Sequence, residues 1–215
     1  MKWQAVFFDF DGVILDSVHV KTEAFAQMFR RFGPDVEQAV VAYHQEHGGI
    51  SRFEKFKHYY KNLLHAPISE DQLQALGEEF SELVLAKILE SPFVDGAYET
   101  LEKLSIEKVP AFVVTGTPEE EIRFIVNKRG LSAFFQEVHG SPRYKDDIIM
   151  DIIGRRGFDP TRCLFLGDAI SDYMAAQSTG TKFQGIVPEG ANSPFPAGTL
   201  ISSAVRCELI IEIDQ

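Results

Sequence analysis

The sequence predicts an α/β protein, a doubly wound parallel sheet whose first strand is followed by an inserted helical segment. Short apolar runs end in acidic residues or glycine, and stretches of helical periodicity lie between them. This alternation is typical of a parallel sheet with helices on both faces. Over residues 17–90 apolar residues recur only at helical spacing, which predicts that this part of the chain forms no strand.

The predicted organisation is therefore a core of residues 1–15 and 91–215, with a helical cap of residues 16–90 inserted after the first strand. A chain of 215 residues suits one domain with a smaller insert. Ser69, followed three residues later by Gln72, predicts a capping box at the start of the last cap helix.

Five apolar runs are predicted to be the strands of the core. They lie at residues 6–8, 111–114, around 138, 163–166 and 183–187. Core helices are predicted over about 98–106, 118–129, 146–156 and 172–178. Thr117 is the expected N-cap of the second of these helices, with Pro118 at its first position. The pattern leaves the structure of residues 195–215 open.

Composition argues against nucleic acid and membranes as partners. The net charge is −11 and the isoelectric point is about 5.0, whereas polyanionic partners favour a basic face. No run approaches the roughly 20 apolar residues of a membrane span. Cys163 and Cys207 show neither a disulfide framework nor metal-ligand spacing, and the first residues do not form a signal peptide. We therefore expect a cytoplasmic protein.

Polar residues and a glycine gather where the predicted strands end or the following helices begin. They are Asp9, Asp11, Thr115, Gly116, Lys145, Asp168 and Asp172. Ligands of open parallel sheets bind beyond the carboxyl ends of the strands, so we expect these groups to converge. Carboxylates a few ångströms apart repel by several kcal/mol, at an effective dielectric constant of about 20. A cation or protonation must relieve this repulsion, and hard oxygen donors without His or Cys favour Mg²⁺.

The order of these motifs resembles the haloacid dehalogenase superfamily. The resemblance rests on Asp9-Phe-Asp-Gly-Val-Ile-Leu-Asp-Ser17, followed by Thr115, Lys145 and Gly167-Asp168-x3-Asp172. More narrowly, it is similar to the branch of phosphatases and phosphomutases with a helical cap, the phosphoglycolate phosphatase and β-phosphoglucomutase type, with a Rossmann-like core. The resemblance implies a magnesium-dependent phosphatase. Its substrate would be a small phosphorylated metabolite, such as a sugar phosphate or phosphoglycolate.

The resemblance also implies roles for the acids. Asp9 would attack phosphorus and form an aspartyl-phosphate, while Asp11 would protonate the leaving oxygen and later accept a proton from water. Because these roles need different protonation states, the pKa of Asp11 is expected to be raised. The metal would be held by Asp9, the backbone carbonyl of Asp11 and Asp168. Asp172 would act behind these ligands or through a water.

The phosphoryl oxygens would be held by Thr115, the amide of Gly116 and Lys145. The family lysine is usually followed by proline, whereas acids follow Lys145, so Arg143 is an alternative cation. In the cap, a Gly-Gly loop that ends at Arg52 is similar to a loop that points into the active sites of such enzymes. Arg52 is therefore a candidate contact for the part of the substrate that does not react.

Other polar and aromatic residues have structural explanations. Asp16 or Ser17 is predicted to cap the first cap helix rather than to form a catalytic pair. The cap histidines suit no metal site and are expected to face solvent; they are His44, His47, His58 and His65. The aromatic residues expected to form the cap core are Phe53, Phe56 and Tyr60.

Two other functions compete with a phosphatase. A phosphomutase differs only in excluding water from the phosphorylated intermediate, and Gly167-Asp168 is more phosphatase-like than the Glu-Asp pair of known mutases. A phospho-receiver signalling domain also clusters Asp, Thr and Lys around an aspartyl-phosphate. Receivers lack a helical insert, and their acceptor is not the first-strand acid. The sequence leaves the oligomeric state open.

Overall fold

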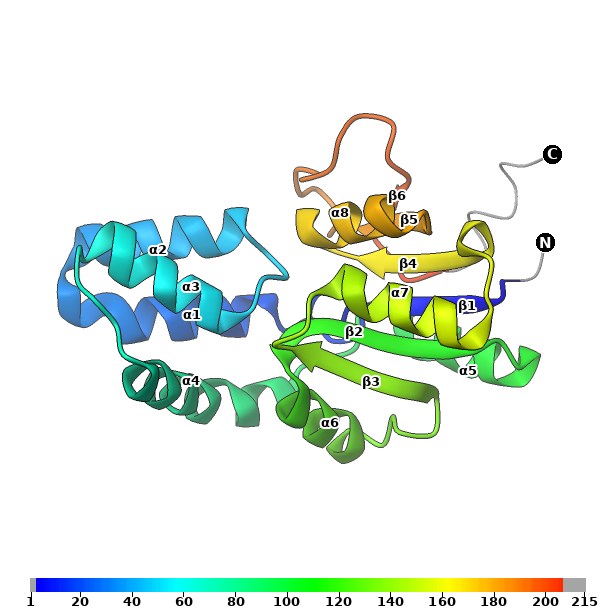
Figure 1. Cartoon of the computed structure of the whole chain (residues 1–215), viewed down its shortest axis with the longest axis horizontal. Coiled ribbons are helices and arrows are strands. Elements are labelled where there is room, and N and C mark those ends of the chain that lie inside the picture. Colours follow the sequence, from blue (N-terminus) through cyan, green and yellow to red (C-terminus); the bar gives the residue numbers. More distant parts are fainter. Residues whose placement is uncertain (1–2, 207–215) are drawn as a thin grey trace.

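The computed structural model describes residues 3–206, which form a sheet covered by helices and a separate lobe of helices beside it (Figure 1). The sheet is parallel throughout, in the order β3-β2-β1-β4-β5-β6. Its strands are β1 (Ala5–Phe8), β2 (Ala111–Pro118), β3 (Phe135–Ser141), β4 (Cys163–Gly167), β5 (Lys182–Ile186) and β6 (Ile201–Ser202). The predicted doubly wound α/β fold is confirmed.

The helices fall into two groups. Those of the separate lobe are α1 (Val18–Phe29), α2 (Pro34–Glu46), α3 (Arg52–His58) and α4 (Glu70–Glu90). Those beside the sheet are α5 (Ala97–Glu107), α6 (Glu119–Lys128), α7 (Lys145–Arg156) and α8 (Ile170–Thr179). Short 3₁₀ turns lie at Arg30–Phe32 and Pro160–Arg162, and a π-helical turn at Tyr59–Leu63 follows α3. None of the helices in residues 3–206 has the length and apolar composition needed to cross a membrane.

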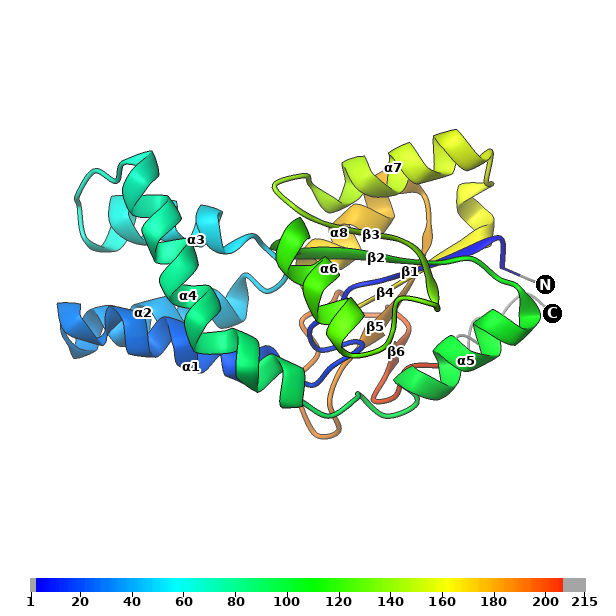
Figure 2. The same ribbon diagram turned by 90° about the horizontal axis from the view of Figure 1, so that it is seen from below.

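Both faces of the sheet are buried, which explains why β1 is apolar without a break. Successive side chains of a strand point to opposite faces. Phe7 packs in the cluster that includes apolar residues of α7 and α8, whereas Phe8 packs in the cluster with those of α5 and α6. Figure 2 shows these two pairs of helices on opposite sides of the sheet.

The helical lobe has an aromatic core that is continuous with one face of the sheet. Phe25, Phe56 and Phe80 are all at most 2% exposed and contact one another through their rings. Phe53 and Tyr60 are partly buried against this cluster, so the predicted cap-core role of the aromatics is confirmed. We keep the name cap for residues 16–90; the division of the chain at these residues stays a proposal.

The predicted capping box of α4 is present, because Ser69 accepts a hydrogen bond from the amide of Gln72 and the Gln72 side chain accepts one from the amide of Ser69. The predicted cap of α6 is wrong, because strand β2 runs on through Pro118, so that α6 begins at Glu119 and Thr117 does not cap it. Ser17 stands at the N-cap position of α1 as predicted, but its side chain makes no capping hydrogen bond.

The C-terminal part of the chain adds one element that the sequence pattern did not indicate. Strand β6 pairs with β5 and extends the sheet at that edge. Residues 207–215, which belong to the predicted core segment and to the stretch left open above, lie outside the described residues.

Candidate active site

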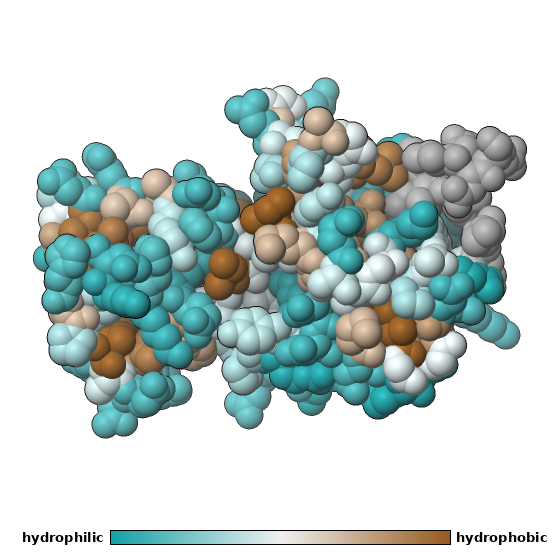
Figure 3. All heavy atoms as spheres, turned by 45° about the horizontal axis from the view of Figure 1, so that its top comes forward, coloured by the Kyte–Doolittle hydropathy of each residue, from teal (hydrophilic) through white to brown (hydrophobic). Residues whose placement is uncertain are grey.

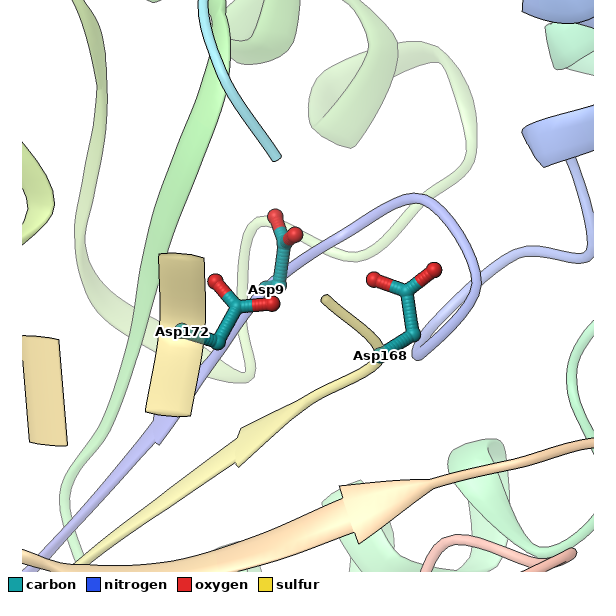
Figure 4. A group of neighbouring side chains, drawn as sticks. All are labelled: Asp9, Asp168 and Asp172. Atoms are coloured by element: carbon teal, nitrogen blue, oxygen red, sulfur yellow. The ribbon is translucent and has the colours of Figure 1, made fainter. Parts of the chain in front are cut away.

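Three of the predicted acids meet at the carboxyl edge of the sheet. Asp9 follows β1, Asp168 follows β4, and Asp172 lies in the first turn of α8. Because β1 and β4 are neighbours, their ends lie side by side. Oxygen atoms of the three carboxylates lie within 4.8 Å of one another, and Figure 4 shows the three groups around one space.

Lys145 is the cation of this cluster. It is the first residue of α7, and its Nζ donates to Asp9 Oδ2 at 2.8 Å and to Asp172 Oδ1 at 2.5 Å. Burial opposes its charge, but Asp172 and Asp9 outweigh burial and raise the pKa of Lys145. Arg143, the alternative cation, is exposed and contacts Asp151 at 3.3 Å instead. The structure therefore brings Lys145, and not Arg143, to the proposed nucleophile.

The acids of the cluster are incompletely neutralised by the protein. Burial, followed by repulsion from Asp9 and Asp172, raises the pKa of Asp168 well above its ordinary value. Burial also raises the pKa of Asp172 to about 6, although Lys145 opposes that shift. These neighbouring carboxylates repel one another when they are ionised, and a bound cation would relieve that repulsion.

The donor set fits Mg²⁺, with Asp172 in a different position from the other two acids. In the described residues Asp168 accepts no hydrogen bond, and Asp9 keeps lone pairs beyond its contacts with Lys145 and the Phe10 amide. Both oxygens of Asp172 already accept a hydrogen bond, one from Lys145 and one from the Ala169 amide at 3.0 Å. Asp172 therefore suits a supporting position or a water-mediated contact, and direct ligation of a metal would fall to Asp9 and Asp168.

Asp11 lies beside this cluster in a polar cage. Ser17 Oγ donates to its carboxylate at 2.6 Å, Thr117 Oγ1 donates at 3.1 Å, and Lys21 forms an ion pair with it. Burial raises the pKa of Asp11, but the charge of Lys21 and the hydrogen bonds from Lys21, Ser17 and Thr117 together lower it below its ordinary value. The predicted rise in the pKa of Asp11 is therefore wrong for this structure.

Ser17, Lys21 and Thr117 were not singled out as site residues by the sequence. Lys21 also donates to Thr117 Oγ1 at 2.7 Å, and so joins the cap helix α1 to the end of β2. One signal was present: Lys21 follows Ser17 by four residues on a helix, so both side chains lie on one face. The two residues predicted as caps, Ser17 and Thr117, use their hydroxyls on Asp11 instead.

Close packing at glycines brings the cap loop onto the core. Gly12 has a φ of +79°, and a Cβ there would overlap the Asp168 carboxylate. A Cβ at Gly116 would overlap the carbonyl of Gly49 in the cap loop. Ser171 Oγ at the start of α8 donates to the carbonyl of Gly48 at 3.0 Å. The loop before α3 therefore lies directly over the carboxyl edge of the sheet.

Arg52, the predicted substrate contact, is buried between the two lobes. It is 5% exposed, forms an ion pair with Glu121 on α6, and donates to Ser81 at 2.7 Å. Its guanidinium lies 4.5 Å from the centre of the Phe80 ring. Arg52 thus ties α3 and α4 of the cap to α6 of the core, and its contact with substrate stays a prediction.

A cavity of about 130 Å³ lies between the lobes. Its core side includes Asp9, Asp11, Thr115 and Asp168, and its cap side is formed by α1, α2, the cap loop and α3. The space-filling view shows the two lobes as separate masses with a notch between them (Figure 3). Lys145 and Asp172 do not line this cavity; they support Asp9 from behind.

Comparison with known proteins identifies the family. The family model described as haloacid dehalogenase-like hydrolase matches residues 6–186. The chain belongs to the haloacid dehalogenase-like hydrolases. The predicted superfamily, its hydrolase class and its Rossmann-like core are confirmed.

Relatives of this hydrolase include phosphatases. Phosphoglycolate phosphatase 1 of Pseudomonas aeruginosa is 25% identical over 182 residues, which are 82% of this chain and 66% of that enzyme. The chain therefore spans slightly less than two thirds of that relative. Phosphoglycolate phosphatase of Yersinia pestis is also 25% identical, over 82% of this chain and 78% of that enzyme.

A solved structure shares the fold of this hydrolase. β-Phosphoglucomutase from Clostridium difficile is similar with a TM-score of 0.79 and 19% identity, over 99% of this chain and 96% of that one. At that identity the likeness shows the fold alone. It extends over both lobes, because nearly the whole of each chain is covered.

Proposed function

We propose that this hydrolase is a magnesium-dependent phosphatase that forms an aspartyl-phosphate on Asp9 and acts on a small phosphorylated metabolite. The observation that carries the proposal is the placement of Asp9 against Lys145, beside two further acids whose pKa values are raised. That cluster combines a fixed carboxylate nucleophile with a site for a cation. The phosphoglycolate phosphatases among the relatives support phosphoglycolate or a sugar phosphate as substrate.

In the first step, an Asp9 oxygen forms a bond to phosphorus while the bond from phosphorus to the leaving oxygen breaks. Lys145 holds the Asp9 carboxylate in place through Oδ2, and the Phe10 amide fixes the other oxygen at 2.7 Å. Thr115 and the amide of Gly116 line the cavity where the phosphoryl oxygens would lie. Bound Mg²⁺ would supply positive charge to these oxygens, and Asp9 and Asp168 would hold it.

Asp11 moves the protons. In its protonated form it gives a proton to the leaving oxygen, and in its ionised form it takes one from the water that attacks the aspartyl-phosphate. The Lys21 ion pair favours the ionised form, which is the form that the second step needs. Because Lys21 belongs to a cap helix, the position of the cap bears on the protonation of Asp11.

The test is phosphate release from a panel of phosphorylated metabolites with Mg²⁺. Asp9→Asn removes the nucleophile and should lower kcat by on the order of 10⁴-fold or more. A chelator should abolish activity, and added Mg²⁺ should restore it. Asp35→Asn, at an exposed acid of α2, is the matched control and should leave the rate unchanged.

Acid-quenched wild type should carry one phosphoryl group on Asp9, detected by mass spectrometry of the peptide. Undiminished hydrolysis by Asp9→Asn would sink the proposal, and activity that ignores the chelator would remove magnesium from it. A sugar monophosphate that is isomerised without release of phosphate would identify a mutase instead.

A further inference from the structure

Lys55 differs from the other cations that line the cavity. Lys21 is paired with Asp11 and Arg52 with Glu121, whereas Lys55 has no acidic partner among residues 3–206. Its side chain is deep inside the cap, since the residue is only 2% exposed. The protein therefore buries one ammonium group beside the cavity without supplying the opposite charge.

The one hydrogen-bonding partner of Lys55 within the described part of the chain is a neutral histidine. Lys55 Nζ lies 2.7 Å from Nδ1 of His44, a residue of α2 that is 6% exposed. The prediction that His44 faces solvent is therefore wrong. Burial, and then the charges of Lys55 and Lys21, lower the pKa of His44 to about 3, so that its ring is neutral.

The contact with Lys55 decides which ring nitrogen of His44 carries the hydrogen. An ammonium has only donors, so Nδ1 must accept and Nε2 must carry the hydrogen. Nε2 of His44 is buried and has no hydrogen-bond partner in the described structure. Two residues that line the same cavity thus present donors that lack an acceptor.

Such an arrangement is costly for folding. A buried ammonium without a counter-charge loses its hydration, and an apolar side chain among the aromatic rings of the cap would avoid that loss. Burial, and then repulsion by Lys21 and Lys145, lower the pKa of Lys55 to about 7, although Asp168 opposes the shift. The cost is explained if the missing negative charge arrives with a ligand of the cavity.

We propose that Lys55, supported by His44, binds a second anionic group of the substrate, a carboxylate or a second phosphate, on the cap side of the cavity. This inference rests on the proposed function, which places the reacting phosphoryl group at Asp9 on the core side. The carboxylates of Asp9, Asp11 and Asp168 repel a further anion from the core side. The substrate class is therefore a small phosphate ester with a negative charge at each end.

The experiment compares substrates that differ only in that charge. 2-Phosphoglycolate carries a carboxylate where ethyl phosphate has a methyl group, and ethane-1,2-diol bisphosphate carries a second phosphate. Wild type should prefer one of the two charged esters over ethyl phosphate, and the preferred one identifies the anion. Lys55→Met should lower kcat/KM for that ester by about ten- to hundredfold, the range for a hydrogen bond to a charged group. Its rate on ethyl phosphate should stay within about twofold.

Three further variants separate charge from shape. Lys55→Arg keeps a cation and should recover part of the preference, while Lys57→Met, at an exposed lysine of the same helix, should change nothing. Lys55→Gln is a second uncharged variant, and both Lys55→Met and Lys55→Gln should melt at or above the wild-type temperature. Calorimetric titration of the charged ester into Asp9→Asn, with and without Lys55→Met, measures the same preference without turnover.

Equal losses on charged and uncharged esters, or a wild type without preference between them, would overturn this inference. Either result leaves the phosphatase proposal intact as long as hydrolysis of ethyl phosphate depends on Asp9. Hydrolysis that survives Asp9→Asn would instead refute the proposed function, whatever Lys55 does.

Discussion

The two sides of the cavity treat a buried lysine in opposite ways. On the core side Lys145 lies between Asp9 and Asp172, which raise its pKa despite burial. On the cap side Lys55 has His44 and an aromatic ring beside it but no acid among residues 3–206, and burial lowers its pKa to about 7. The core lysine is paired with acids of the protein itself and holds the proposed nucleophile in place. The cap lysine gains its counter-charge only from a ligand, which suits a residue that selects substrates.

The largest effect is expected on the core side. Lys145→Met removes the cation from the proposed nucleophile, and loss of one such charged contact in a water-excluded site lowers kcat by about 10²- to 10³-fold. The loss should be the same for ethyl phosphate and for charged esters, because Lys145 holds Asp9, and Asp9 would attack the phosphoryl group that all of these esters share. Steady-state rates on both substrates measure it.

Arg143→Met is the matched control, because Arg143 lies two residues away and its exposed guanidinium contacts Asp151. It should retain the wild-type rate within about threefold. If Arg143→Met lost more activity than Lys145→Met, the predicted phosphate-binding cation would be Arg143. If Lys145→Met lowered the rate on charged esters alone, the contrast between the two sides of the cavity would disappear.

The core side was predictable because ligands of open parallel sheets bind beyond the carboxyl ends of the strands. Asp9, Asp168 and Lys145 stand at the ends of apolar runs or at the start of the next helix, and parallel pairing necessarily brings such positions together. The environment of Asp11 was not predictable in this way. Lys21 reaches Asp11 only because the cap helix α1 packs against the end of β2, and local sequence does not specify that contact.

The cap side was harder to predict for a related reason. A histidine in a polar stretch of α2 is ordinarily solvent-exposed, and the burial of His44 arises because α1 and α3 pack over it. Lys55 stands between Glu54 and Phe56 in a helix of only 7 residues. Only tertiary packing shows that it faces the cavity, so sequence alone directed attention to Arg52.

A moderate effect is expected for Arg52, the cap cation that does have a partner. If Arg52 contacts the non-reacting part of the substrate, Arg52→Ala should raise KM for a charged ester by about tenfold and spare ethyl phosphate. Glu121→Gln keeps the arginine but removes the charge that holds it, and it tests whether the ion pair across the lobes matters in itself.

Arg31→Ala is the control, since Arg31 is an exposed cap arginine paired with Glu79 at 3.6 Å. Equal losses on both esters from Arg52→Ala, reproduced by Glu121→Gln, would assign Arg52 to holding the lobes together. Selectivity for the second anion would then rest on Lys55 and His44 alone.

The smallest effect is on thermal stability, and it reports the cost of burying Lys55. The pKa of Lys55 is about 7 in the folded protein and 10.5 in the unfolded chain, so between these pH values the unfolded chain binds more protons than the folded protein. The destabilisation by Lys55 is therefore fully present below pH 7 and decreases as the pH rises toward 10.5. Lys55→Met removes it, and should melt a few degrees above wild type at pH 6, since 1 kcal/mol corresponds to about 2–4 °C at this chain length.

The difference between the two melting temperatures should shrink steadily toward pH 10. The charged groups that act on Lys55 are Lys21, Lys145 and Asp168, and His44 stays neutral above pH 6. These groups are present in both proteins, so their own titration largely cancels in the difference. A charged ester added at pH 6 should raise the melting temperature of wild type more than that of Lys55→Met, because it supplies the missing counter-charge. A difference that is constant with pH would show that Lys55 is not buried as an unpaired ammonium, and would remove the contrast with Lys145.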